Sequence, residues 1–154
     1  MSRLSDHEIK TLADKMLKDY DEVNPGTIFA KKFDLKVSDA WRLQTAVAKI
    51  RENRGEKIIG YKIGCVSEIT QKNLGLTHPA WGRLWLNEQH NDGATLHKKD
   101  FANVAIEAEF AVFIDSNIDP GKTSIKNILG SIASVHPVIE IHNFVMRGKH
   151  PNGS

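Results

Sequence analysis

The segment 106–114 reads Ile106-Glu107-Ala108-Glu109-Phe110-Ala111-Val112-Phe113-Ile114. Apolar, β-branched and aromatic residues dominate it, and the turn-forming run Asp115-Ser116-Asn117 follows, so the pattern predicts a β-strand. Residues two apart project from the same face of a strand. We therefore expect Glu107 and Glu109 to lie side by side on one face, with the neighbouring apolar residues on the other.

Two carboxylates placed side by side have two interpretations. Such a pair most often belongs to the solvated face of an alternating strand. The alternative is a hard divalent cation, whose charge offsets the repulsion between the carboxylates.

A third carboxylate, Glu140, lies within the apolar run Val138-Ile139-Glu140-Ile141, where burying an unpaired charge is costly. It too has a simpler interpretation, as an outward-facing residue of an edge strand. Together with Glu107 and Glu109 it would form an oxygen-rich site suited to Mg²⁺ or Mn²⁺. His136 and His142 flank Glu140 and could reach the same site, although an exposed or hydrogen-bonded histidine is the commoner case.

Residues 1–55 carry a helical pattern. Ser5 and Glu8 have the spacing of a capping box, and apolar residues recur at helical spacing over roughly residues 6–20. Ser38 is expected to cap a second helix, and Gly55 stands where a C-terminal cap usually lies.

From Lys57 onward the pattern is mainly one of strands. Further strands are expected at 58–65, 83–86 and 138–141. Ser67 to Leu74 reads as a short helix ended by Gly75, and helical spacing returns over 124–135. Because helices precede strands, the order favours an α+β fold over a doubly wound sheet. We expect a single domain over 1–154, with a helical region at 1–55 and a β-rich region at 56–154.

The composition is that of a globular protein, with 154 residues, 40% hydrophobic and 26% charged. A formal net charge of +2 and scattered basic residues argue against nucleic acid as a partner. The sequence shows neither an apolar run of membrane-spanning length nor an apolar signal core. Cys65 is the single cysteine, which excludes an internal disulfide and suits a reducing compartment. We expect a cytoplasmic protein that binds neither nucleic acid nor membranes.

Five short motifs carry a family resemblance. In chain order they are Gly60-Tyr61-Lys62-Ile63-Gly64, Gln71-Lys72-Asn73-Leu74-Gly75, Pro79-Ala80-Trp81-Gly82, Ile106-Glu107-Ala108-Glu109-Phe110-Ala111 and His136-Pro137-Val138-Ile139-Glu140-Ile141. Their order and separations resemble those of the 2-keto-4-pentenoate hydratases, in the fumarylacetoacetate hydrolase superfamily. The resemblance implies N-terminal helices followed by a mixed β-sheet or roll. It covers only the N-terminal part of the family pattern, so we expect an incomplete, truncated β-rich region.

The resemblance also implies a catalytic site. In it, Glu107, Glu109 and Glu140 hold Mg²⁺ or Mn²⁺, which chelates a small 2-oxo or 2-hydroxy-dienoic acid. Lys62 matches the family's active-site lysine, which would stabilise enolate charge or relay a proton. Spacing alone also allows a surface lysine at this position. Asn143 departs from the pattern, since the family usually carries an aspartate there.

The function expected from the resemblance is that of a metal-dependent hydro-lyase of aromatic catabolism, a hydratase that adds water to a short 2-hydroxy-dienoate. Two alternatives use the same metal site: hydrolysis of an acylpyruvate and decarboxylation of a 2-oxo acid. A third is a truncated remnant without catalysis. Family members oligomerise, so a homo-oligomer is expected.

Overall fold

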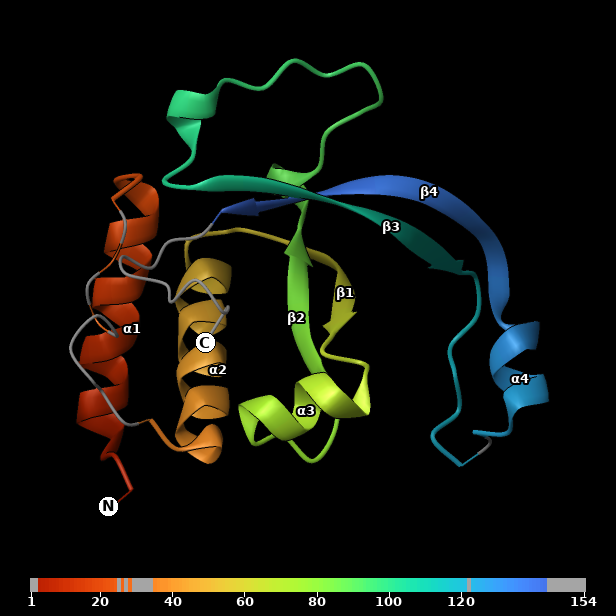
Figure 1. The fold of residues 1–154 in the computed structure, drawn as a ribbon, viewed down its shortest axis with the longest axis horizontal. Helices are drawn as coiled ribbons and strands as arrows, with labels where there is room; N and C mark the ends of the chain where they lie inside the picture. Colours follow the sequence, from red (N-terminus) through yellow and green to blue (C-terminus); the bar gives the residue numbers. More distant parts are fainter. Residues whose placement is uncertain (1–2, 25, 27, 29–34, 122, 144–154) are drawn as a thin grey trace. The chain divides into compact units, whose positions relative to one another are not determined.

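The computed structural model describes residues 3–24, 26, 28, 35–121 and 123–143 (Figure 1). Within these residues the chain divides into two compact units, with the boundary between Ala102 and Asn103. Helices and strands are both present, and the expected α+β class is confirmed. That the two units make one domain over 1–154 stays a prediction. Among the described helices, none combines the length and the apolar character that crossing a membrane requires.

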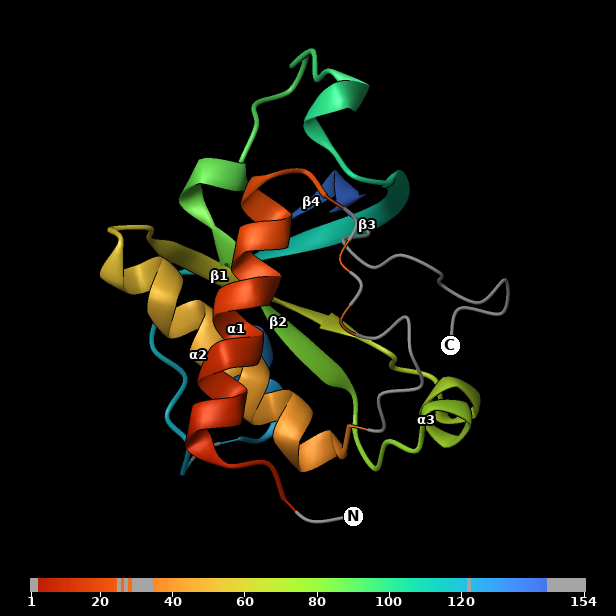
Figure 2. The same cartoon turned by 90° about the vertical axis from the view of Figure 1, so that its left-hand side faces the viewer.

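The first unit begins with two helices, α1 (Asp6–Asp21) and α2 (Val37–Asn53), which pack against each other (Figures 1 and 2). Their contact buries Ile9 and Ala13 of α1 against Leu43 of α2. Partly buried apolar side chains surround these three: Leu4, Leu12, Met16, Leu35, Ala46, Val47 and Ile50. This helix pairing forms the apolar core cluster of the unit. Full burial of one large aliphatic side chain stabilises the fold by about 1.5–3 kcal/mol.

The helix ends agree with the sequence at three of the four expected caps. Ser5 and Glu8 form the predicted capping box at the start of α1. At the end of α2, Gly55 has a φ of +93°, a backbone conformation that glycine adopts without strain. The prediction for Ser38 is wrong, because α2 begins at Val37 and its N-cap is Lys36, which makes no side-chain cap bond.

Asp39 explains why α2 starts early. Its buried carboxylate accepts a hydrogen bond from the backbone N–H of Leu4 at 3.1 Å and one from Arg42 Nη1 at 2.7 Å. Arg42 Nη1 also donates to the carbonyl of Leu4 at 2.7 Å. These bonds fix the first turn of α2 to the segment before α1, in place of a serine cap. The hydrogen bond from Leu4 and the Arg42 guanidinium hold the pKa of Asp39 below its ordinary value, against the opposing effect of burial.

Two strands, β1 (Ile58–Gly64) and β2 (Ala80–Trp85), form an antiparallel pair in the first unit. β2 begins at Ala80 rather than at the predicted Arg83, because Ala80 and Trp81 pair with the end of β1. The helices hold this pair through α2: Trp41 stacks on Trp81 at 5.6 Å between ring centroids, and Gln44 Nε2 donates to the Trp81 carbonyl at 2.8 Å.

The short helix α3 (Glu68–Leu74) follows β1 and buries none of its residues. Its first turn is capped by Ser67, whose Oγ accepts from the Thr70 N–H at 3.1 Å. Gly75, with a φ of +66°, ends it as predicted. Gln71 Nε2 donates to the carbonyl of Cys65 at 2.9 Å. Gln71 and Gly75 of the second motif therefore have structural roles, since they shape the turn after β1.

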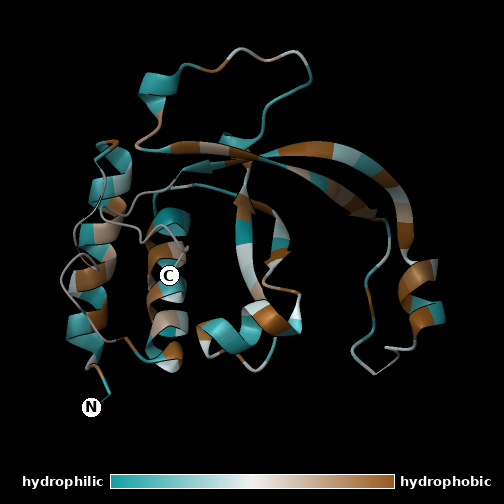
Figure 3. Cartoon of the chain, in the orientation of Figure 1, coloured by the Kyte–Doolittle hydropathy of each residue, from teal (hydrophilic) through white to brown (hydrophobic). Residues whose placement is uncertain are grey.

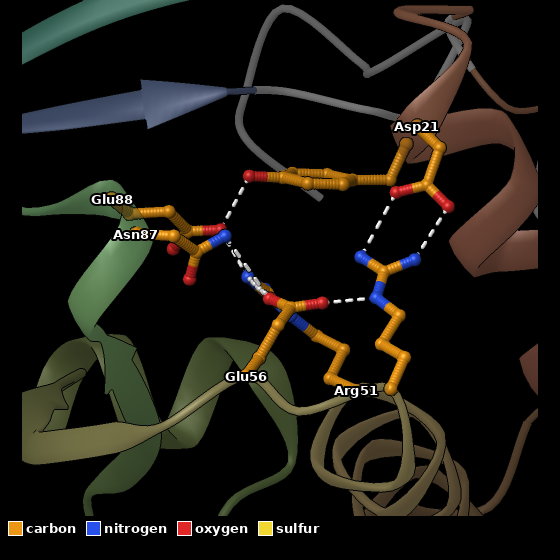
Figure 4. A network of polar contacts seen from close by, with 7 residues as sticks. Asp21, Arg51, Glu56, Asn87 and Glu88 are labelled. Atoms are coloured by element: carbon orange, nitrogen blue, oxygen red, sulfur yellow. Dashed lines mark hydrogen bonds and ion pairs between the residues drawn. The ribbon is translucent and has the colours of Figure 1, made fainter.

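A polar network joins α1, α2 and the turn η1 (Leu86–Glu88) within the first unit (Figure 4). Arg51 of α2 is at its centre, with Nη2 2.6 Å from both Glu56 Oε2 and Glu88 Oε1. Its guanidinium also lies over the Trp85 ring, 4.2 Å from the centroid. Arg54 contacts the other side of Glu56 and holds Asp21 by two hydrogen bonds of 2.7 and 3.0 Å.

Tyr20 completes the network by donating its hydroxyl to Glu88 Oε1. Burial, together with this bond to a carboxylate, raises the pKa of Tyr20. A second short turn, η2 (Lys98–Asp100), lies near the end of the first unit.

The second unit is an antiparallel pair formed by β3 (Val104–Ile114) and β4 (Ile132–Asn143), with the short helix α4 (Ile125–Gly130) between them. The predicted helix over 124–135 is therefore too long, and the predicted strand over 138–141 is too short. Ile132, Ser134 and Val135 are part of β4 because they pair with the end of β3. This pairing overrides the local helical spacing.

The two faces of this pair differ in chemistry, although hydrophobic residues prevail along both strands (Figure 3). One face of β3 carries Ile106, Ala108 and Phe110, as the sequence predicts. The other face carries Glu107 and Glu109, opposite Glu140 and Val138 of β4.

Candidate metal centre

Glu107 and Glu140 are cross-strand partners in the β3–β4 ladder. Directly opposed residues of an antiparallel pair project from the same face with their Cβ atoms about 4.5–5.5 Å apart. Two like charges in this position repel each other, more strongly where they are shielded from water. The Glu140 side chain is 21% exposed and that of Glu107 is 56% exposed, so the pair is only partly screened by solvent.

His142 lies two residues beyond Glu140 on the same face of β4. Its Nε2 atom is shielded from solvent and lies 3.0 Å from Glu107 Oε2 and 3.5 Å from Glu140 Oε1. One ligand atom from each of these three residues lies within 4.8 Å of the other two. The structure thus brings together two of the three predicted carboxylates and one of the two flanking histidines.

The separations in this group fit a small divalent cation. Two adjacent ligands of an octahedral ion at about 2.1 Å lie about 3 Å from each other. The 3.0 and 3.5 Å separations of the nitrogen and the two oxygens are close to that value. Carboxylate oxygen and imidazole nitrogen are both ordinary ligands of divalent metals. The donor set therefore fits a metal ion.

Glu109 and His136 stand apart from this group. Glu109 shares the face of Glu107 but pairs with Val138, and among the described residues it belongs to no such group of three ligand atoms. His136 forms a hydrogen bond of 2.9 Å with Ser134 and packs edge-on against Phe113 at 5.2 Å between ring centroids. His136 is therefore held by its own neighbours, further along β4.

Lys62 lies on β1, in the first unit, opposite Gly82 of β2. It is half-buried, as are Gly60 and Gly64 on the same face of the strand. A Cβ atom at Gly82 would lie 3.4 Å from Lys62 Cγ, so the missing side chain leaves room for the lysine stem. The glycines of the first and third motifs thus border Lys62 on its own face of the β1–β2 pair.

His142 belongs to the group although the sequence marks it only as a flanking candidate, because a lone histidine carries little information. Residues two apart in a strand project from the same face, and this applies to Glu140 and His142 as it does to Glu107 and Glu109. This spacing is the sequence signal that identifies His142. The strand was expected only over 138–141, which left His142 outside the element whose periodicity would have aligned it.

Comparison with known proteins identifies similar chains. No family model matches the sequence. A 2-keto-4-pentenoate hydratase of Paraburkholderia xenovorans is 27% identical over 108 residues, covering 70% of this chain and 40% of the relative. A 2-hydroxyhexa-2,4-dienoate hydratase of Comamonas testosteroni is 27% identical over 110 residues, covering 70% and 42%. The resemblance to the hydratases is confirmed, and the chain spans about two fifths of the length of these relatives.

A solved structure shares the fold. The 4-oxalocrotonate decarboxylase of Pseudomonas putida G7, complexed with magnesium and adipate, superposes with a TM-score of 0.84 at 23% identity. The match covers 96% of this chain and 57% of the decarboxylase. A second structure of that enzyme, complexed with calcium and acetate, gives a TM-score of 0.83. The expected fold is thereby confirmed, since this chain shares the fold of that decarboxylase over nearly its whole length.

Proposed function

We propose that this chain carries the metal site of a hydro-lyase that adds water to a short 2-hydroxy-dienoate of aromatic catabolism. The observation that carries the proposal is the group formed by Glu107, Glu140 and His142, whose ligand atoms lie within 4.8 Å of one another. Support also comes from the relatives, which are named hydratases, and from a structural neighbour complexed with magnesium.

In this proposal Glu107, Glu109 and Glu140 hold Mg²⁺ or Mn²⁺. When bound, such an ion would supply Lewis-acid activation of the substrate acid. The carboxylates fix the position of the ion and, through it, the orientation of the acid. Glu109 is included because it shares the face of Glu107, two residue pairs further along the ladder.

Lys62 is the proposed proton-transfer residue. Its ammonium group would stabilise negative charge on the enolate and relay a proton as the dienol becomes an α,β-unsaturated ketone. Water then adds across the activated double bond. Support for the role comes from the match of Lys62 to the family motif and from the glycines that border it. We also propose that the protein acts as a homo-oligomer on this small acid.

Two other reactions use the same chelation and remain alternatives. They are hydrolysis of an acylpyruvate and decarboxylation of a 2-oxo acid; one structural neighbour is itself a decarboxylase. The fold does not separate these reactions, because all three activate a 2-oxo or 2-hydroxy acid at a metal. A folded remnant that binds no metal is the non-enzymatic alternative.

A substrate panel tests the proposal. The chain is incubated with Mg²⁺ or Mn²⁺ and with a 2-hydroxy-dienoate, an acylpyruvate or a vinylogous 2-oxo acid. Loss of dienoate absorbance with formation of the hydrated product supports the hydro-lyase. Cleavage of the acylpyruvate or release of carbon dioxide favours the corresponding alternative. Calorimetry that detects no heat with either ion contradicts a metal-dependent enzyme and favours the remnant.

Replacing the lysine tests its role separately. Lys62→Met removes the cation but keeps a side chain of similar length. Turnover should be abolished while the affinity for the metal, measured by calorimetry, stays unchanged. Unchanged turnover would contradict the assigned role of Lys62 without affecting the metal site.

A further inference from the structure

His142 adds a nitrogen donor to the carboxylate pair, and this changes which ions the site should prefer. We propose that His142 Nε2 is a direct metal ligand, and that it shifts the preference of the site from Mg²⁺ toward a nitrogen-binding divalent ion such as Co²⁺ or Ni²⁺. The inference rests on the metal site of the proposed function and adds a ligand that the three-glutamate site lacks.

His142 Nε2 faces both carboxylates of the pair. The Nε2 atom lies 3.0 Å from Glu107 Oε2 and 3.5 Å from Glu140 Oε1, so one imidazole nitrogen faces two carboxylates at once. A proton on that nitrogen forms a well-aligned bond to one oxygen at a time. A dication bound by all three atoms satisfies both carboxylates together, at separations that suit adjacent ligands.

The backbone of β4 places His142 on the face that carries Glu140. Residues 140 and 142 project from the same face of β4, and both pair with β3 over a continuous ladder. His142 therefore lies beside the carboxylates in a strand that is already ordered by pairing, and no loop has to become ordered to bring it there. The imidazole is 24% exposed, similar to the 21% of Glu140, so both are partly withdrawn from solvent.

Imidazole nitrogen and carboxylate oxygen favour different divalent ions. Mg²⁺ prefers an all-oxygen environment and retains several waters, whereas imidazole suits Co²⁺, Ni²⁺ and Zn²⁺. Adding one imidazole to the glutamate ligands should raise the affinity for these ions much more than the affinity for Mg²⁺.

The test compares ions and variants on the whole 154-residue chain. Calorimetry with Mg²⁺ and with Co²⁺ is carried out on the unmodified chain and on the variants His142→Ala and His136→Ala. His136 is the matched control, since it lies on the same face of β4 but is held by Ser134 and Phe113. We expect His142→Ala to weaken Co²⁺ binding by about 100-fold or more, and His136→Ala to leave it unchanged. Mg²⁺ binding should change far less in either variant.

A spectroscopic measurement keeps the inference testable if His142→Ala folds poorly. Mn²⁺ bound to the unmodified chain should show the nitrogen coupling of a coordinated imidazole in pulsed electron paramagnetic resonance. The coupling should persist in His136→Ala. Metal binding without nitrogen coupling, or equal Co²⁺ affinity in His142→Ala, overturns the inference but leaves the carboxylate site intact. Failure of every ion to bind overturns the site itself and with it the inference.

Discussion

Glu107 and Glu140 are directly opposed across the β3–β4 ladder, one from each strand, with their carboxylates on the same face. Opposed like charges destabilise an antiparallel pair. A cation bound between them removes that repulsion. It can bind there only while the two strands are paired, because each strand provides one of the carboxylates. The proposed metal site and the stability of the second unit are therefore linked.

This linkage predicts that divalent cations slow amide hydrogen exchange in β3 and β4. At a cation concentration 100 times the dissociation constant, the folded pair gains about 2.7 kcal/mol. Exchange measured by mass spectrometry should show this protection in the unmodified chain and in Asp115→Asn, which changes an exposed carboxylate just beyond the other end of β3. Glu107→Gln should lose most of it. Equal protection in Glu107→Gln would show that the cation acts elsewhere.

Arg51 should be the most sensitive charged residue of the first unit. Its side chain is 8% exposed and lies between Glu56 and Glu88, so Arg51→Ala removes one of the two guanidinium groups that contact the shielded Glu56 carboxylate and leaves Glu88 without that partner. We expect a loss of about 3–5 kcal/mol in unfolding free energy. Trp41, Trp81 and Trp85 all lie in this unit, so tryptophan fluorescence in urea reports it. Lys10→Ala, which breaks an exposed ion pair with Asp14, should cost only about 0.2–0.5 kcal/mol.

The Glu56 carboxylate should make the stability of the first unit sensitive to acid. Burial raises the pKa of its carboxyl, but the hydrogen bonds from Arg51 and Arg54 outweigh burial and hold the pKa below 4.5. A lowered pKa stabilises the fold at pH values above 4.5, and the contribution disappears as the pH falls through the lowered value. Urea midpoints should therefore decrease between pH 6 and pH 3. Glu56→Gln should start lower at pH 6 and decrease less. A decrease equal to that of the unmodified chain would exclude Glu56 as its source.

The sequence predicted the elements whose signals are local. The capping box of Ser5 and Glu8, the left-handed Gly75 and the alternation through Glu107 each depend on neighbouring residues, and each is present as expected. The class of fold follows from the order of these elements. The family resemblance added the grouping of carboxylates from two strands, of which Glu107 and Glu140 are directly paired.

Three differences come from partners distant in sequence. β2 begins early because β1 provides a pairing edge for Ala80, and Ile132 joins β4 because the end of β3 is opposite it. α2 begins before Ser38 because Asp39 is bonded to Leu4. Propensity cannot anticipate such contacts, since tertiary pairing overrides it. The longer β4 is also what places His142 beside the carboxylates.

The helix α3 should depend on its two caps more than on packing, because none of its residues is buried. Ser67 accepts the Thr70 N–H at its start, and Gly75 adopts a left-handed conformation at its end. Ser67→Ala and Gly75→Ala should each destabilise the helix by about 1 kcal/mol, the first through a lost hydrogen bond and the second through backbone strain. Amide exchange within α3 should accelerate about fivefold in each variant, in line with that free energy.

Gly60→Ala is the matched glycine control, since its added Cβ meets Leu84 at an ordinary 3.7 Å and its φ is not positive. Unchanged exchange in both cap variants would show that tertiary contacts, and not the caps, hold α3 in place.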